Sequence, residues 1–290
     1  TEQYDGGYVN CGPTPVHFFH EGKWEGPFVY GLQRERDPET YMNVFTEDTD
    51  NVYHIRFFAQ GRKGGEYKIL GLIPCNLHLF QAEGDGQVFL FGTDSMGRDL
   101  FSRVLLGARI SLFIPVVGML MTVALGLLIG SLAGYFGGWV DMVIQRAIEV
   151  VRSFPNVPLW MALSAALPAT LKPAQVFMLM TVILSLISWP NLARTVRSQF
   201  FAVKQEDFIM AARISGAPAP AIVTRHMIPS FLSYIIVNMT LTIPQLIVGE
   251  TTLSFLGLGL RSPATSWGVL LQETNQLETI MFYGWKLIPG

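Results

Sequence analysis

Two cysteines and two histidines near the start of the chain have side chains that bind metals or form covalent links. Cys11 and Cys75 are the only cysteines, and His17 and His20 are three residues apart. Thiolates and imidazoles are zinc ligands, but these four residues match no standard zinc pattern closely. In an oxidising compartment the two thiols would instead form a disulfide, which stabilises by roughly 4 kcal/mol in the chain-entropy model. We therefore expect a Cys11–Cys75 disulfide, with a zinc site as its alternative.

The familiar catalytic and nucleotide-binding motifs do not occur in this sequence. It contains no GxxxxGK(S/T) phosphate loop, no HExxH zinc motif and no recognisable Ser/His/Asp arrangement. Two isolated acids, Asp141 and Glu250, stand within or beside long apolar stretches. Either could act as a catalytic acid only with a second carboxylate or a metal ligand at the same depth, and the sequence shows no such pair. The sequence therefore favours a non-catalytic role.

Charge is distributed unevenly between the two ends of the chain. Only 14% of the 290 residues are charged and 50% are hydrophobic, whereas soluble domains have about 25% charged residues. Residues 1–108 hold 15 of the 22 acidic residues and 9 of the 20 basic ones, so an acidic front part precedes an apolar, slightly basic remainder. This pattern excludes an ordinary cytosolic enzyme, a disordered chain and a nucleic-acid-binding protein, which would carry a basic stripe.

Long uncharged stretches in the apolar part are sufficient to cross a lipid bilayer, which requires about 20 apolar residues. We expect membrane-spanning helices at about 109–134, 143–167, 175–193 and 229–249. The alternative, four buried helices of a large soluble protein, is disfavoured because no segment is amphipathic enough to cover them. Gly126, Gly130 and Gly134 recur at four-residue spacing, which lets two helix backbones approach closely.

The charges that remain in the apolar part indicate its orientation. The loop 194–228 carries five basic residues and two acidic ones, and positively charged loops stay in the cytoplasm. Residues 1–92 and 250–285 are then expected on the outer side. Because an outward domain needs a means of export, and because 281–290 looks like the approach to a helix, we expect one further helix before Thr1 and one after Gly290.

The acidic front part mixes β-type runs with turn signals. Residues 52–60 and 67–72 have the aromatic and β-branched content of strands, and glycine-rich turns separate such runs. We expect an extracytoplasmic domain over 1–92, small and of α+β or mostly β structure, followed by a transmembrane domain over 93–290.

The inward-facing loop contains a short helix that cannot be stable alone. Residues 206–216 read E-D-F-I-M-A-A-R-I-S-G, which predicts a helix ending at Gly216, followed by a proline break and a second helix start. Isolated helices shorter than about 12 residues are marginal in water. This helix therefore needs a partner or the flanking spans, and the small side chains of Ala211 and Ala212 would let it enter a partner's groove.

This segment resembles the cytoplasmic EAA loop of ABC-importer permeases, whose pattern is E-A-A, three residues, G, and then I and L-P. Here the pattern reads M-A-A-R-I-S-G over 210–216, then Ile222, then Ile228 and Pro229. Met210 replaces the glutamate, so no salt bridge is expected from that position, while the docking helix is still expected. In the family this helix fits a cleft on the ATPase subunit and transmits nucleotide-driven motion.

Two further segments resemble oligopeptide and dipeptide permeases. They read G-T-D-x-x-G-R-D-x-x-S-R over 92–103 and E-x-x-L-S-F-L-G-L-G over 250–259. With the loop, the resemblance covers about 91–290 and is closest to the second, C-type permease of the peptide/nickel group. Residues 1–92 resemble the outer extension that some members carry between spans one and two.

The resemblance implies an all-α polytopic membrane protein with the fold of a type I ABC importer permease (MetI-like), in the bacterial or archaeal cytoplasmic (inner) membrane. It implies a heterodimer with a second homologous permease subunit, two ATPase subunits and an extracytoplasmic solute-binding protein. ATP and Mg²⁺ would be held by the ATPase subunits, so this chain would be no enzyme and carry no cofactor. Di- or oligopeptides are the expected solutes, with oligosaccharides, opines or nickel complexes as alternatives.

The resemblance also implies which residues contact or move with the ATPase subunits. They are Glu206, Asp207, Phe208, Met210, Ala211, Ala212, Arg213, Gly216, Ile222, Arg225 and Pro229. A plain cytoplasmic connector is the alternative for this loop. Glu250 is a candidate outer gate or solute contact, or else it caps or pairs locally, and the sequence leaves both open.

Two hypotheses from other functional classes, an enzyme and a sensor, compete with the hypothesis of a transporter subunit. A membrane-embedded enzyme would need the paired acids that the sequence lacks. A sensor with an outward ligand-binding domain would need a cytoplasmic signalling domain, and the longest inner segment is the loop 194–228.

Overall fold

The computed structural model describes residues 6–39, 41–60, 67–69, 73–75, 77–168, 170–261 and 264–287, with only the backbone described at 60, 67–69 and 73–75. The chain divides into two compact units. Unit 1 comprises residues 1–108 and 270–290, and unit 2 comprises residues 109–269. Unit 1 therefore includes the segments 93–108 and 270–290, which the sequence analysis placed in the transmembrane domain.

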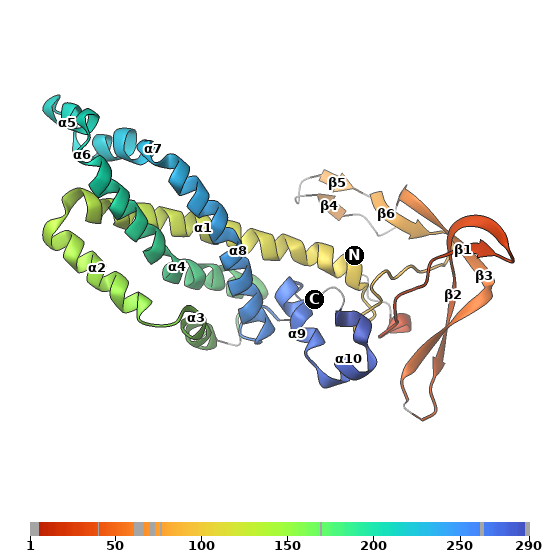
Figure 1. The fold of residues 1–290 in the computed structure, drawn as a ribbon. Coiled ribbons are helices and arrows are strands. Elements are labelled where there is room, and N and C mark those ends of the chain that lie inside the picture. The colour runs from red at the N-terminus through yellow and green to blue at the C-terminus, as the bar shows by residue number, and fades with distance from the viewer. Residues whose placement is uncertain are drawn as a thin grey trace. The chain divides into compact units, whose positions relative to one another are not determined.

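Unit 1 is built around an antiparallel sheet (Figure 1). The sheet order is β1 (His17–His20), β2 (Lys23–Arg36), β3 (Asn43–Gln60) and β6 (Leu77–Ala82), and β4 (Tyr67–Ile69) pairs separately with β5 (Ile73–Cys75). The pairing of β2 with β3 shifts register between Tyr30 and Gly31, as at a β-bulge. Phe28 and Val29 on β2 are fully buried. The small N-terminal β domain is thereby confirmed.

The two segments that flank residues 109–269 in the sequence pack together in unit 1. Helix α1 (Leu100–Phe136) begins here, and α9 (Trp267–Thr274) leads into α10 (Leu277–Phe282) and a 3₁₀ turn, Gly284–Leu287. Gly92 has φ of 74°, and a Cβ at this position would lie 2.6 Å from the Cys11 carbonyl oxygen and 2.8 Å from the Trp285 ring. Only glycine allows this close approach between the N-terminal and C-terminal segments.

Three helices are long and apolar enough to cross a membrane, judged by length and composition among the described residues. They are α1 with 37 residues, α4 (Pro173–Val203) with 31 and α8 (Leu232–Phe255) with 24. These contain three of the four expected spans, at 109–134, 175–193 and 229–249. Pro115, Pro190 and Pro244 lie inside them without ending the helices.

The expectation of one continuous helix over 143–167 is wrong. The chain forms α2 (Gly138–Arg152) and α3 (Asn156–Ala165), with a break at residues 153–155. Pro155 has no N–H to donate and disfavours the helical conformation in the residue before it. Helix α2 packs beside α4, and α3 packs beside α4 and α8. Because Asp141 near the start of α2 bonds Arg197 near the end of α4, α2 and α3 together run antiparallel to α4.

The expected glycine spacing on α1 forms a close helix contact with α4. A Cβ would lie 2.9 Å from Leu192 at Gly126, 2.6 Å from the Ala193 carbonyl at Gly130, and 2.4 Å from the Phe200 Cβ at Gly134. Real Cβ atoms essentially never approach heavy atoms under 3.0 Å. The three glycines therefore set the separation of α1 and α4, and the close approach expected from the sequence is confirmed.

Candidate functional site

A short helix, α5 (Asp207–Ile214), lies at one end of unit 2 (Figure 1). The side chain of Ile209 is fully buried in a cluster with Phe200 from α4 and with Ile222, Met227 and Phe231 from the segment that leads into α8. Burying an isoleucine contributes about 1.5–3 kcal/mol. We call this buried cluster the seat of α5, and it supplies the tertiary support that an eight-residue helix needs.

The chain leaves α5 through two backbone irregularities. Gly216 has φ of 77°, and its N–H donates to the Arg213 carbonyl at 3.0 Å, as in a glycine helix cap. After α6 (Ala219–Ala221) follows a π-helical turn, Ile222–Met227, and then α7 (Ile228–Ser230). The Ile228 N–H donates to the Val223 carbonyl, five residues back. Single π turns inside helices occur often at functional sites.

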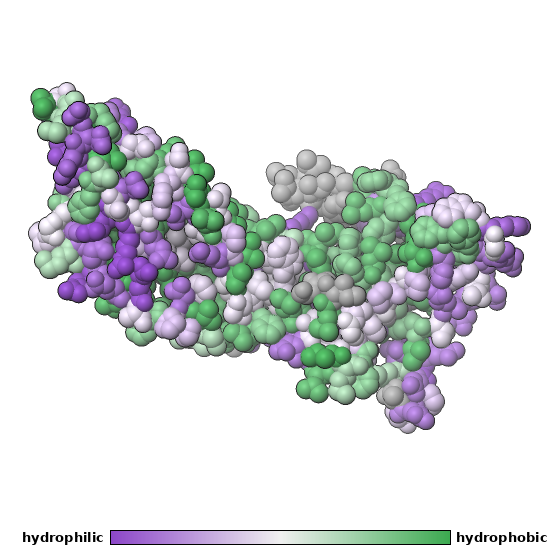
Figure 2. Space-filling view, viewed as in Figure 1, coloured by the Kyte–Doolittle hydropathy of each residue, from purple (hydrophilic) through white to green (hydrophobic). Residues whose placement is uncertain are grey.

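The outward side of α5 is apolar but exposed. Phe208 is 45% exposed, Met210 51% and Ile214 85%. Phe208, Ala211 and Ile214 follow at three-residue spacing, which places them on one side of the helix. Small helices rarely leave several large apolar side chains in water unless these side chains contact a partner. Figure 2 shows hydrophilic side chains gathered at the same end of unit 2, around α5 and the neighbouring parts of α2 and α4.

Charged side chains tie the α5 region to the neighbouring helix ends. Lys204 Nζ donates to the Tyr135 carbonyl, near the end of α1, at 2.7 Å, and the Arg213 guanidinium lies 5.7 Å from the centre of the Tyr135 ring. Arg197 donates through two nitrogens to the Asp141 carboxylate. A bidentate arginine pair fixes orientation as well as distance. These contacts connect α5 and Lys204 with the end of α1, and the start of α2 with the last part of α4.

The structure exposes most of the residues expected to act in coupling. Ile222 is buried in the cluster under α5 and Ala212 is half-buried, so both belong to the seat. The exposed ones are Glu206, Asp207, Phe208, Met210, Ala211, Arg213, Gly216, Arg225 and Pro229. Ile209 was not among the predicted residues, although its three-residue spacing from Ala212 indicates a buried stripe. Tyr135 was not predicted either, and the sequence offers no signal for it, because 69 positions separate it from Lys204.

Glu250 lies in the last turns of α8, fully buried. Its carboxylate accepts hydrogen bonds from Ser254 Oγ at 2.8 Å and from Ser111 Oγ of α1 at 3.3 Å. In the structure Glu250 therefore pairs locally, which was one of the two expectations for it. A role as outer gate stays a prediction.

The G-T-D-x-x-G-R-D-x-x-S-R segment forms a buried ionic cluster in unit 1. Arg103 is 2% exposed and donates to Asp94 at 2.8 Å and to both Glu273 oxygens at 2.5 and 2.9 Å. Arg98 donates to Asp94 at 2.7 Å. Buried charges persist only when they are paired and hydrogen-bonded. The cluster thus joins the start of α1 to the end of α9.

Asp99 caps α1 at its first turn. Its Oδ2 accepts the Ser102 N–H at 2.9 Å and the Ser102 hydroxyl at 2.6 Å. Burial raises the pKa of the Asp99 carboxyl. Asp99 therefore supplies the N-terminal cap of α1.

Cys11 is a buried, free cysteine in this structure. The side chain of its expected partner, Cys75, lies outside the described residues, so the disulfide stays a prediction. His17 Nε2 lies 3.1 Å from a Glu47 oxygen, and His20 Nδ1 lies 3.1 Å from the Tyr30 hydroxyl. Among the described residues no three His, Cys, Asp or Glu side chains are grouped as a metal would require.

The Cys11 thiol is expected to resist alkylation in the folded protein. Burial raises its pKa to about 12, so at pH 8 it stays protonated, and the thiolate is the reactive form. A maleimide should therefore label Cys11 only after denaturation, as mass spectrometry would detect. If labelling after denaturation also requires a reductant, Cys11 is in a disulfide. Rapid labelling of the native protein would contradict the burial.

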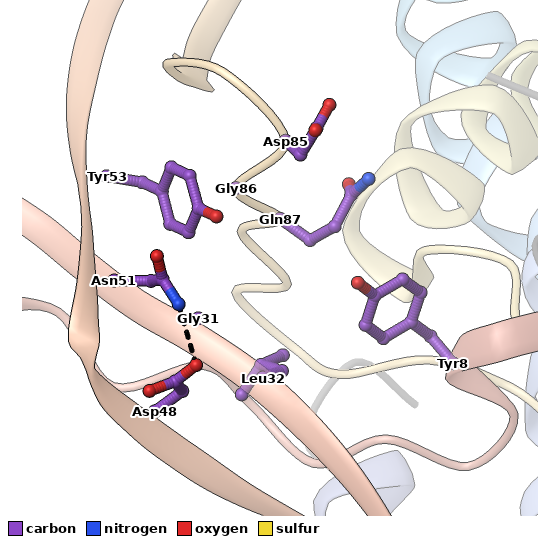
Figure 3. A pocket seen from close by; sticks show the side chains of 9 residues that line it. All are labelled: Tyr8, Gly31, Leu32, Asp48, Asn51, Tyr53, Asp85, Gly86 and Gln87. Carbon is purple, nitrogen blue, oxygen red and sulfur yellow. Dashed lines mark hydrogen bonds between the residues drawn. The ribbon is translucent and has the colours of Figure 1, made fainter.

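A small polar hollow lies in unit 1 (Figure 3). It has a volume of about 170 Å³ and is lined by Tyr8, Gly31, Leu32, Asp48, Asn51, Tyr53, Asp85, Gly86 and Gln87. Hydrogen bonds from Gln33 and Asn51 lower the pKa of Asp48. Ligand pockets usually measure about 300–1,000 Å³. The hollow is therefore too small to compete with α5 as the candidate site.

Comparison with known proteins places most of the apolar part in one family. Residues 126–286 match the binding-protein-dependent transport system inner membrane component family. The oligopeptide transport system permease protein OppC of Haemophilus influenzae is 39% identical over 183 residues, which are 63% of this chain and 57% of that protein. The dipeptide transport system permease protein DppC of Bacillus subtilis is 37% identical over 195 residues, 67% of this chain and 58% of that protein.

A second Bacillus subtilis protein, the oligopeptide permease OppC, is 34% identical over 197 residues, 68% of this chain and 62% of that protein. The chain thus spans about three-fifths of the length of these relatives. The family match begins within α1 and includes α4, α5 with its seat, and α8 with Glu250. Because it covers more than half of the sequence, the chain belongs to the family of binding-protein-dependent transport system inner membrane components.

Proposed function

We propose that the chain is a permease subunit of an ATP-driven importer of di- or oligopeptides. The observation that carries this proposal is α5, whose apolar side is exposed while Ile209 fixes the helix from below. Such a helix suits a groove on a separate protein. The printed names of the relatives, oligopeptide and dipeptide permeases, support the class of solute.

In this proposal the energy source lies on other chains. Two ATPase subunits hold ATP and Mg²⁺ and receive α5 in a groove. A second homologous permease completes the pathway, and an extracytoplasmic binding protein delivers the peptide. This sequence contains no phosphate-loop motif, which supports placing ATP binding on the ATPase subunits.

The proposed orientation places α5 in the cytoplasm and unit 1 outside. Basic side chains at the α5 end, among them Arg194, Lys204 and Arg225, support this direction under the positive-inside rule. Helices α1, α4 and α8 each cross the bilayer, and α2 with α3 cross it together. A crossing by α2 and α3 together agrees with their antiparallel direction along α4.

The docking role of α5 is tested by making its exposed side polar. In Phe208→Ser/Ile214→Ser, both changed side chains are 45% or more exposed, so we expect the chain to fold and insert normally. Removing two apolar anchors should lower co-purification of the ATPase subunits by at least about tenfold, since hot-spot truncations cost 2 kcal/mol or more.

The matched control is Leu277→Ser, which changes a 76% exposed leucine on α10 in unit 1. It should leave ATPase association unchanged. If the α5 variant retains the ATPase subunits as well as the control does, α5 is not the docking helix.

Gly216→Val is expected to uncouple ATP hydrolysis from peptide uptake. A left-handed conformation costs roughly 1–2 kcal/mol for a residue with a Cβ, and no atom lies within 4 Å of the site to clash or compensate. The strain loosens the end of α5 but leaves its apolar side in place. The ratio of ATP hydrolysed to peptide imported, measured in proteoliposomes, should rise. Gly216→Asn, which tolerates this conformation, is the control, and equal ratios in both variants would contradict the prediction.

A further inference from the structure

Among the described residues, the hydrogen-bond donors to the Glu250 carboxylate are serine hydroxyl groups. Ser254 donates to one oxygen and Ser111 to the other. None of the ion pairs among the described residues includes Glu250. An acid at this place is costly unless its oxygens are satisfied. The hydroxyls therefore supply what a basic partner would otherwise supply.

Each serine that donates to Glu250 also holds the chain that follows α8. The Leu260 N–H donates to Ser254 Oγ at 3.2 Å, and the Trp267 N–H donates to Ser111 Oγ at 3.0 Å. Two relays thus run from the carboxylate through a hydroxyl to a backbone amide. One relay anchors residues 257–261 to α8, and the other anchors residues 264–268 to α1.

Two glycines let both segments lie directly on the last turn of α8. A Cβ at Gly259 would lie 2.5 Å from Ser254 Oγ, and one at Gly268 would lie 2.6 Å from the Ser254 Cβ. Leu260 and Val269 are 2% and 1% exposed. Both segments are therefore packed as well as hydrogen-bonded at the Glu250 end of the helix.

The opposite end of α8 lies in the seat of α5. Ile235, in the first turn, is buried in the same cluster as Ile209. With 24 residues the helix is about 36 Å long at 1.5 Å per residue. One continuous helix therefore connects the seat of α5 with the segments that Glu250 holds.

We propose that Glu250 is a positioning residue that fastens residues 257–261 to α8 and residues 264–268 to α1, so that a displacement of α8 at its α5 end is delivered to these two segments. The proposal rests on the proposed function, in which α5 receives motion from the ATPase subunits. Glu250 then acts through its serines and makes no contact with the peptide. To act as a gate or to contact the solute, Glu250 would have to lose its hydrogen bonds with these hydroxyls.

The relays are tested separately by removing one hydroxyl at a time. In nanodiscs, Ser254→Ala should speed amide hydrogen exchange at Leu260 by at least tenfold and leave Trp267 protected. Ser111→Ala should do the reverse. The control is Ser188→Ala in α4, whose hydroxyl bonds only the Leu184 carbonyl four residues back, and both amides should stay protected in it. Protection of Leu260 and Trp267 in all three variants would overturn the proposal.

Transport kinetics separate positioning from solute contact. In proteoliposomes with the partner subunits, Glu250→Ala should lower the maximal rate of peptide uptake at least tenfold with the KM nearly unchanged, while ATP hydrolysis continues. Glu250→Gln keeps an oxygen acceptor for one serine and should restore most of the rate and the amide protection. A raised KM with an unchanged maximal rate and protected amides would overturn the proposal in favour of solute contact.

The two kinds of failure are distinguishable. If the unchanged chain with its partners imports no peptide, the proposed function fails, whatever the exchange data show. If the unchanged chain imports peptide but the serine variants keep both amides protected, the Glu250 proposal alone fails.

Discussion

Arg103→Met is expected to destabilise unit 1 by about 3–5 kcal/mol, the usual result of removing one partner from a buried ion pair. Arg103 and Asp94 are 2% and 1% exposed, and Arg103 also holds both oxygens of Glu273. Without the guanidinium the Asp94 carboxylate loses its most buried partner and retains Arg98. Differential scanning calorimetry of the purified protein would measure the loss, together with hydrogen exchange at residues 92–103.

Arg56→Met is the matched control for this variant. Arg56 pairs with Glu83, but its side chain is 73% exposed, and exposed pairs contribute about 0–1 kcal/mol. A second comparison is Asp94→Asn/Arg103→Met, which removes both charges and should be more stable than the single variant. If Arg103→Met is no less stable than Arg56→Met, the cluster does not hold unit 1 together.

Ile209→Asp is expected to abolish coupled transport. The change places a carboxylate among Phe200, Ile222, Met227 and Phe231, where no partner for it lies in the cluster, and it removes the apolar contact that seats α5. A loss of about 3 kcal/mol would shift the equilibrium between placed and displaced α5 by roughly 150-fold towards the displaced state, and the apparent affinity for the ATPase subunits falls with the fraction of chains in which α5 is placed. Peptide uptake and ATPase co-purification are the measurements.

The conservative control is Ile209→Val, which removes one methylene and should cost about 0.5–1.5 kcal/mol. It should retain most of the uptake. Limited proteolysis between 204 and 217 should be faster in the aspartate variant alone. Uptake by Ile209→Asp at the level of Ile209→Val would show that α5 does not need its seat.

The long helices were predictable because a helix that crosses a bilayer needs about 20 mostly apolar residues. Helices α1, α4 and α8 follow that rule, and interior prolines do not end them. The pair α2 and α3 was not predictable as two helices from hydropathy alone, since the apolar run continues through the break at Pro155. The contact of Gly126, Gly130 and Gly134 with α4 was predictable as a close approach, but the sequence does not name the partner helix.

The candidate site was predictable to the extent that it is local. The α5 helix and its Gly216 end follow from neighbouring residues, and the resemblance adds the docking role. The contacts that support α5 depend on pairs far apart in the chain, such as Asp141 with Arg197. One partner of Glu250 is likewise distant in the sequence, because Ser111 lies 139 positions away. No rule of spacing connects such residues before the helices have packed.

The ionic cluster of unit 1 also constrains the order in which the protein is completed. Arg103 and Glu273 are 170 positions apart, and Lys286 Nζ donates to Asn10 Oδ1 at 2.7 Å across 276 positions. The ribosome makes residues 92–108 before unit 2, at about 5–20 residues per second. Arg103 can pair with Asp94 at once, but Glu273 and Lys286 can join unit 1 only after unit 2 has been synthesised. Unit 1 is therefore completed by residues 270–287, which are made after unit 2.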